Sequence, residues 1–165
     1  MKTLHVLLAS SDRVTMNRIE ALVHDICFER VLVEFTRTAR VDDFEKLGSC
    51  SWLDLIIFSP DNLSSGTQRS SRNVFPEAIR AVREIRKRAL MPLVAFGISE
   101  DDKMQVYEAG VDIVAGRLLE VDSLRAELTR VLNLPSPARK QAPVSASFFG
   151  RLFQLKKRVA KSAVA

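Results

Sequence analysis

Three serines stand where apolar, strand-like runs of the chain end, and their hydroxyls are the first groups to consider for chemistry. They are Ser10, Ser11 and Ser59. A magnesium site needs several oxygen ligands, and the nearest carboxylates, Asp12 and Asp61, come a few residues beyond the ends of these runs. A serine hydrolase needs a base beside its hydroxyl, and neither of the two histidines ends an apolar run. We therefore expect no catalytic site and no metal site.

Anion binding is the other chemistry open to Ser10 and Ser11, because a helix N-terminus rich in hydroxyls favours negative charge. Arg117 would complete such a site if the fold brings it close. The alternative is that one of the serines caps the following helix, while Arg117 is solvated or pairs with Asp12. The chain contains neither GxGxxG nor a phosphate-binding GxxxxGKS or GxxxxGKT, so no nucleotide cofactor is expected.

The charge of this 165-residue chain is distributed unevenly. From Leu134 onward there are seven bases and no acid, so the residues before it hold 18 bases against 20 acids. The basic character therefore belongs to the C-terminal region, and nucleic-acid binding is not expected. Cys27 and Cys50 lack metal-ligand spacing and are expected to be buried free thiols. Because no apolar run suits a membrane span or a signal peptide, we expect a cytoplasmic protein.

Short apolar runs alternate with segments of helical periodicity. The runs that predict strands cover 4–9, 31–35, 53–58, 92–96 and 111–115. The segments that predict helices cover 14–26, 41–47, 76–90, 101–109 and 120–132. This alternation predicts an α/β fold with a five-stranded parallel sheet of flavodoxin-like order and helices on both faces. We expect one domain over residues 1–134.

The composition changes after this domain. Residues 135–147 are rich in Pro, Ala and Ser and predict a linker, and residues 148–165 predict a basic amphipathic helix, here called the tail. Its contact residues are predicted to be Phe148, Phe149, Leu152, Phe153, Lys156, Lys157 and Arg158. They are expected to meet a partner protein or a membrane surface, while docking on the chain's own domain and formation of a homodimer stay open.

A second unusual segment, residues 64–73, is dense in Ser and Arg. This composition predicts a flexible insertion. A kinase-type site or a partner contact at residues 69–72 is the alternative.

Three segments resemble the receiver domain of two-component response regulators. LDLIIFSPD is similar to the family's third strand, MPLVAFGIS to its fourth, and EAGVDIVAGRLLEVDSL to its fifth. The resemblance covers residues 2–133 and implies the same fold as the alternating pattern does.

The resemblance also implies that the family's active residues are missing. Its magnesium-binding acid pair falls on Ser10 and Ser11, and its phospho-acceptor aspartate falls on Ser59. Its hydroxyl, lysine, cis-proline and switch aromatic fall on Gly97, Arg117, Leu118 and Val114. Neutral hydroxyls are poor metal ligands and poor nucleophiles at neutral pH. The chain therefore resembles a pseudo-receiver whose degenerate phosphorylation pocket also contains Asp12.

The function that this resemblance implies is a non-catalytic module of two-component phosphorelay signalling, an adaptor that acts by protein–protein contact and is no enzyme. In the family, regulatory contacts usually use the fourth helix, fifth strand and fifth helix. The residues of interest there are Val106, Tyr107, Val111 and Leu118.

Two alternatives from other classes remain. One is a peripheral membrane or scaffold-targeted protein that is addressed by the tail. The other is a small-anion binder that uses Ser10, Ser11 and Arg117.

Overall fold

A single parallel sheet organises the N-terminal part of the chain. The computed structural model describes residues 2–28, 30–65, 74–116 and 121–132. Their strands pair in the order β2-β1-β3-β4-β5, and every pair is parallel. The strands are β1 (Thr3–Ala9), β2 (Leu32–Thr38), β3 (Leu55–Phe58), β4 (Leu93–Ile98) and β5 (Ile113–Gly116). The predicted fold class is confirmed.

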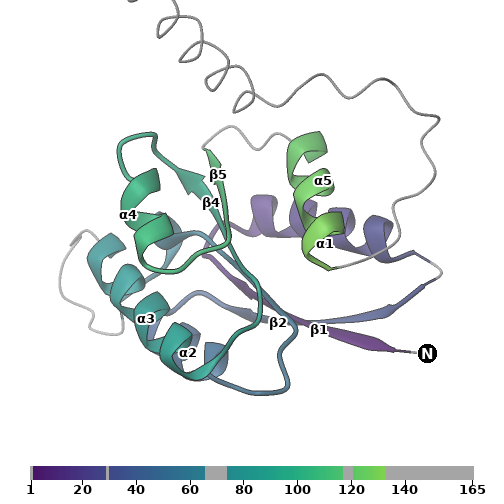
Figure 1. Ribbon diagram of the computed structural model, residues 1–165, viewed down its shortest axis with the longest axis horizontal. Helices are drawn as coiled ribbons and strands as arrows, with labels where there is room; N and C mark the ends of the chain where they lie inside the picture. Colours follow the sequence, from purple (N-terminus) through teal and green to yellow (C-terminus); the bar gives the residue numbers. More distant parts are fainter. Residues whose placement is uncertain (1, 29, 66–73, 117–120, 133–165) are drawn as a thin grey trace, which may run out of the picture. The chain divides into compact units, whose positions relative to one another are not determined.

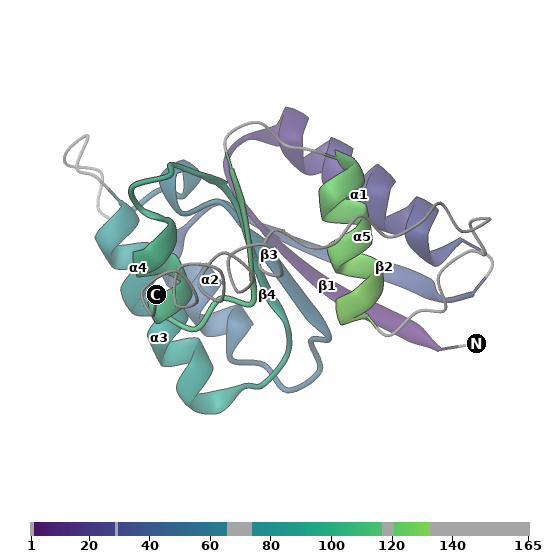
Figure 2. The ribbon, with the colours of Figure 1, turned by 45° about the horizontal axis from the view of Figure 1, so that its top comes forward.

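Helices cover both faces of the sheet. They are α1 (Arg13–Cys27), α2 (Val41–Gly48), α3 (Phe75–Arg88), α4 (Lys103–Glu108) and α5 (Val121–Val131), with a short 3-10 turn, η1, at Pro60–Asn62. Figures 1 and 2 show α2, α3 and α4 on one face and α1 and α5 on the other. Residues Met1–Leu134 form one compact unit, distinct from Pro135–Ala165. The predicted linker and tail lie outside the described residues.

The central strand β3 is buried on both of its faces. All four of its side chains are buried, as expected for the most apolar run of the sequence. Because side chains alternate along a strand, Ile56 joins the apolar cluster beneath α2, α3 and α4, whereas Ile57 joins the cluster beneath α1 and α5. This strand therefore ties the two layers of the core together.

Two apolar residues that the helical patterns included are exposed. Val14 is 69% exposed, because it lies five residues before Ile19 and hence about 140° around the helix from it. Leu90 is 94% exposed, because α3 already ends at Arg88 and Leu90 lies in the turn that leads to β4. Cys27 is buried as expected, and burial raises the pKa of its thiol, but Cys50 is only half-buried.

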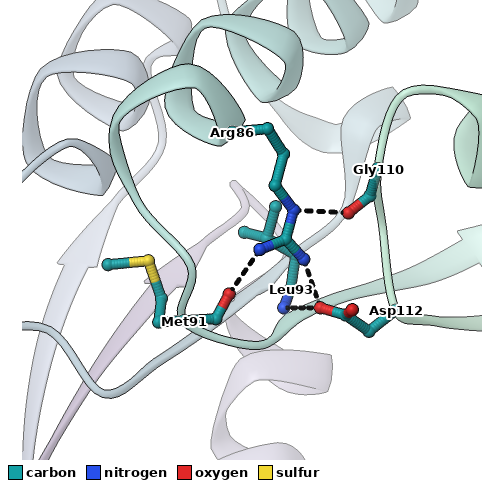
Figure 3. Close-up of polar contacts among 5 residues, drawn as sticks. All are labelled: Arg86, Met91, Leu93, Gly110 and Asp112. Atoms are coloured by element: carbon teal, nitrogen blue, oxygen red, sulfur yellow. Dashed lines mark hydrogen bonds and ion pairs between the residues drawn. The ribbon is translucent and has the colours of Figure 1, made fainter.

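Arg86 on α3 holds the starts of β4 and β5 together (Figure 3). Its guanidinium donates to the Gly110 carbonyl at 2.5 Å and to the Met91 carbonyl at 2.7 Å, and it pairs with the Asp112 carboxylate. The same carboxylate accepts the Leu93 N–H at 2.8 Å. Gly110 has a φ of +105°, and a Cβ there would lie 2.8 Å from Arg86 Cγ. Glycine is therefore required both by the backbone and by the approach of Arg86.

Candidate functional site

The serines that end β1 and β3 lie side by side at the carboxyl edge of the sheet. The Ser59 N–H donates to the Ala9 carbonyl at 3.0 Å, and the Ser10 N–H donates to the Thr38 carbonyl at 2.9 Å. Ser10 and Ser59 are both fully buried, whereas Ser11 is exposed. Ser10 and Ser59 therefore lie together at this edge, and both of their hydroxyls are shielded from solvent.

Asn62, which the sequence did not single out, closes this edge. Its side-chain amide donates to Ser59 Oγ at 3.1 Å, and its backbone carbonyl accepts the Ser11 N–H at 2.6 Å. The turn that carries it begins with Pro60, and the Asn62 N–H returns to the Ser59 carbonyl at 3.1 Å. A Ser-Pro pair with Asn two residues later is typical of a tight turn. This pattern is the feature of the sequence that could have pointed to Asn62. The Ser59 hydroxyl thus already has a partner within the fold.

Asp12 caps helix α1, which corrects the expectation that Ser10 or Ser11 would do so. Its Oδ1 accepts the backbone N–H groups of Val14 and Thr15, each at 3.1 Å, and its Oδ2 accepts the Thr15 hydroxyl at 2.5 Å. The Ser10 hydroxyl in turn accepts the Asp12 N–H at 3.1 Å. Aspartate is favoured at this position because a carboxylate satisfies helix-end donors and meets the positive end of the helix dipole.

These hydrogen bonds also favour the ionised form of the Asp12 carboxyl. The Thr15 hydroxyl first, and then the backbone N–H groups of Thr15 and Val14, hold the pKa of the Asp12 carboxyl below its ordinary value. A lowered pKa in the folded state means that the cap contributes stability at neutral pH and loses it as the pH falls through that folded pKa. The oxygens of Asp12 therefore serve the helix and are poorly placed to act as metal ligands.

Gly97 completes this edge beside Ser59. Its φ is +76°, and a Cβ at this position would lie 3.3 Å from Ser59 Oγ. A residue with a side-chain hydroxyl would be strained here by its backbone and crowded by the serine. The absence of a hydroxyl at this position thus fits the local backbone.

The groups that could take part in metal or anion chemistry at this edge are described only in part. Within the part of the chain that the structure describes, no group of three His, Cys, Asp or Glu side chains could hold a metal ion.

The other residues singled out in the sequence are described in part. Val114 is half-buried on β5. Arg117 and Leu118 lie outside the described residues, as do residues 66–73 of the Ser/Arg loop and all predicted contact residues of the tail. No described helix is long and apolar enough to cross a membrane.

The chain was compared with known proteins. No protein-family model matches it, and no curated protein does. Solved structures do match. The receiver domain of a sensor histidine kinase from Pseudomonas aeruginosa, solved with magnesium in its active-site cleft, has 17% identity and a TM-score of 0.59, over 79% of this chain and 98% of that one. A two-component response regulator from Clostridium difficile has 15% identity and a TM-score of 0.59, over 81% and 99%.

The chain has the receiver fold. The same fold occurs in a protein assigned to pilus assembly from Burkholderia thailandensis, with 20% identity and a TM-score of 0.56 over 79% of this chain and 98% of that one. Proteins with different assigned roles thus share this receiver fold, and function has to be argued from the site.

A groove of about 850 Å³ lies along β5, and the three serines do not line it. We call it the β5 groove. It is lined by β5 itself and Asp112 before it, by Ile98 at the end of β4 and residues 99–101 after it, by Lys103 and Tyr107 of α4, and by Ser123, Leu124, Glu127 and Arg130 of α5. Of the expected contact residues in this region, Tyr107 is 48% exposed. Val106 and Val111, the other described residues of interest there, are buried in the core.

Proposed function

We propose that this protein is a non-catalytic signalling or adaptor module that acts by contact with other proteins and is not phosphorylated at the end of β3. The observation that carries this proposal is the state of Ser59. Its hydroxyl is buried and accepts a hydrogen bond from the Asn62 amide. A phosphoryl acceptor of the receiver type needs an accessible carboxylate and a divalent cation beside it.

The neighbours of Ser59 supply neither a base nor a metal ligand. Ser10 carries a neutral hydroxyl that already accepts the Asp12 N–H, and Asp12 is committed to the helix cap. A serine hydroxyl reacts slowly unless an adjacent base takes its proton. Phosphoryl transfer from a small donor therefore has no chemical support at this edge of the sheet.

Acetyl phosphate with Mg²⁺ tests the proposal directly. The full chain should keep its mass and its amide NMR spectrum, whereas a response-regulator receiver with its acid pair, treated alongside, should gain one phosphoryl group. A phosphoryl adduct mapped to the peptide that contains Ser59 would overturn the proposal.

A role at a membrane surface or scaffold is the second candidate, and the composition of the tail favours it. Three phenylalanines within six residues stand beside five bases and no acid in residues 148–165. Such a segment suits anionic lipid as well as an acidic protein surface. In this case the receiver domain would be the cargo and the tail its address.

A further inference from the structure

The amino edge of the sheet, where the strands begin, carries exposed apolar side chains. Because β2, β3 and β4 each follow a helix that runs back along the sheet, the connections into these strands lie at this edge, opposite the edge of the serines. The letter N in Figure 1 stands at the start of β1, which belongs to the same edge. Four large side chains at or just before the strand starts are exposed: Phe28 (69%), Leu32 (52%), Trp52 (46%) and Leu90 (94%). We call them the amino-edge residues.

The register of the strands places two of these residues at one level of the sheet. Thr3 of β1 pairs with Leu32 of β2, and Val6 pairs with Leu55 of β3. Trp52 precedes Leu55 by three residues, as Thr3 precedes Val6, so Trp52 comes near the level of Leu32. Because β1 alone separates β2 from β3, the two residues lie two strand spacings apart, about 10 Å. They therefore belong to one small area of the surface.

The Trp52 side chain is partly packed and partly in water. Its ring meets the His5 ring edge to face, with 5.7 Å between the ring centroids. The rest of the indole faces solvent, since nearly half of the residue is exposed. An aromatic ring that carries a polar N–H is favoured where an apolar phase meets water, and tryptophan is enriched at membrane surfaces for this reason.

Phe28 and Leu90 protrude from connections between elements. Phe28 follows the last residue of α1, and Leu90 lies between the end of α3 and the start of β4. Neither residue lines the β5 groove. A peptide partner usually binds in a groove, whereas protruding apolar side chains can enter the boundary between lipid head groups and acyl chains. The shape of this edge therefore favours a lipid surface as its occupant.

Exposed bases stand beside the amino-edge residues. Helices α2 and α3 both finish at this edge with basic side chains in their last turns, and another base precedes β1. The exposed members of this set are Lys2, Lys46, Lys87 and Arg88. Bases that surround apolar side chains are attracted to anionic lipid head groups, and this attraction falls off within about 10 Å at moderate salt.

The acids near this edge leave its basic character in place. Three of them already have partners in the fold: Asp25 pairs with Arg125, Asp54 accepts the His5 N–H, and Asp112 pairs with Arg86. Glu34 lies two residues inside β2, where its carboxylate meets His5 Nδ1 at 3.3 Å. Lys87 pairs with Glu84 at 2.6 Å, but an ion pair as exposed as this is weak and can exchange for a lipid phosphate.

We propose that the amino edge of the sheet contacts an anionic lipid surface, with the amino-edge residues among the head groups and the bases on lipid phosphates. The proposal rests on the second candidate function, in which the tail brings the chain to a membrane, and it gives the domain a lipid contact of its own. Four side chains cover little area, so this edge alone binds weakly. In a chain that is already held at the surface, the contact forms readily because it no longer costs the freedom of a separate molecule.

Trp52 is the natural probe of this contact, because it is the single tryptophan of the chain. The full chain is mixed with phosphatidylcholine vesicles that contain about 30% phosphatidylserine, and with vesicles of phosphatidylcholine alone. On the anionic vesicles we expect the Trp52 emission to shift to the blue and to be quenched by brominated acyl chains. The signal is read at saturating lipid, where it reports the position of Trp52 and not the affinity of the tail.

A change at Leu90 tests the apolar part of the contact. Leu90→Asp should lower the quenching of Trp52 at least about threefold, because a carboxylate is costly at the lipid boundary. Val14→Asp is the matched control, since Val14 is also exposed but lies in the first turn of α1, at the opposite edge. It should leave the quenching within about 1.5-fold of the parent chain.

Reversal of charge tests the basic part. Lys87→Glu with Arg88→Glu should lower the quenching at least about threefold at low salt, because two attractions become repulsions. Arg13→Glu with Arg18→Glu changes the net charge equally on exposed residues of α1 and is the control. It should leave most of the quenching in place. Thermal unfolding of each variant shows whether the domain is intact.

Several results would overturn the inference. If the chain sediments with anionic vesicles while Trp52 is neither shifted nor quenched, the tail alone makes the contact and its targeting role stands. If the chain does not sediment with them, the second candidate function and this inference fail together. A blue shift with soluble polyglutamate but not with vesicles would assign the edge to an acidic protein instead, and equal quenching on neutral vesicles would remove the role of the bases. None of these results bears on acetyl phosphate, so the proposed lack of phosphorylation is tested separately.

Discussion

The side chains around Ser59 leave its hydroxyl buried and with a partner inside the fold. The serine lies at the end of a central strand, where its N–H donates to the carbonyl of Ala9, the last residue of β1, and its hydroxyl accepts a hydrogen bond from Asn62. A single carboxylate placed there would enter a neighbourhood built for a neutral hydroxyl. Under the proposed function, metal binding at this position would need more than one substitution.

Ser59→Asp tests this at the scale of one residue. We expect no Mg²⁺ binding by calorimetry at neutral pH, because Ser10 and Ser11 still supply no charge and the Asp12 oxygens remain bonded to the helix end. The neutral Ser59→Asn protein is the control for altered size. Tight Mg²⁺ binding by the aspartate variant alone would show that Asp12 or Asp61 completes a site.

At the scale of the elements, strand β3 is buried along its whole length. Ile57→Ala should lower the free energy of unfolding by about 2–5 kcal/mol, because a fully buried side chain leaves a cavity beneath α1 and α5. Leu90→Ala, at a residue that is 94% exposed, should change it by less than about 0.5 kcal/mol. Urea denaturation followed by circular dichroism measures both values, and similar losses for the two variants would contradict this account of the core.

Sequence patterns predicted the elements well and their local details less well. Apolar runs located all five strands, because a parallel sheet that is covered on both faces needs continuous apolar segments. The same patterns missed the last three residues of β2, Thr36, Arg37 and Thr38, which pair with β1 although they are polar. They also placed Leu90 in a helix that ends two residues earlier, since periodicity alone does not locate the end of a helix.

The candidate site was predicted in part. The three serines and Gly97 could be placed from the order of the strands, because parallel strands bring their carboxyl ends to one edge. The hydrogen bond from Asn62 to Ser59 could not be predicted, since it depends on the shape of a three-residue turn. The network of Arg86 was also missed, because its partners lie 5, 24 and 26 residues away and follow no periodic pattern.

At the scale of the whole molecule, the proposed contacts of the tail can be tested separately from the domain with the receiver fold. Phe149→Asp together with Phe153→Asp should abolish partner, dimer or membrane association of the full chain while the domain stays folded. The physical reason is that each phenylalanine contributes roughly 1.5–3 kcal/mol when it is buried, and a buried carboxylate reverses that gain. Sedimentation with anionic vesicles and sedimentation velocity of the protein alone measure the effect.

High salt separates the two contributions to this association. It should weaken binding without abolishing it, because screening removes the attraction of the bases and leaves the apolar contacts. A conservative control, Phe149→Leu with Phe153→Leu, should keep most of the binding. If the doubly acidic variant retains every association of the parent chain, the tail has no role in targeting.

The Arg86 network also constrains when the receiver domain can be completed during synthesis. A ribosome makes the chain from its N-terminus, so α3 is made before all three partners of its arginine. Until residues 110 and 112 have been added, the Met91 carbonyl is the one member of the network that Arg86 can reach. The start of β5 is consequently anchored after the other four strands have been made, and the groove along it belongs to the last stage of assembly on the ribosome.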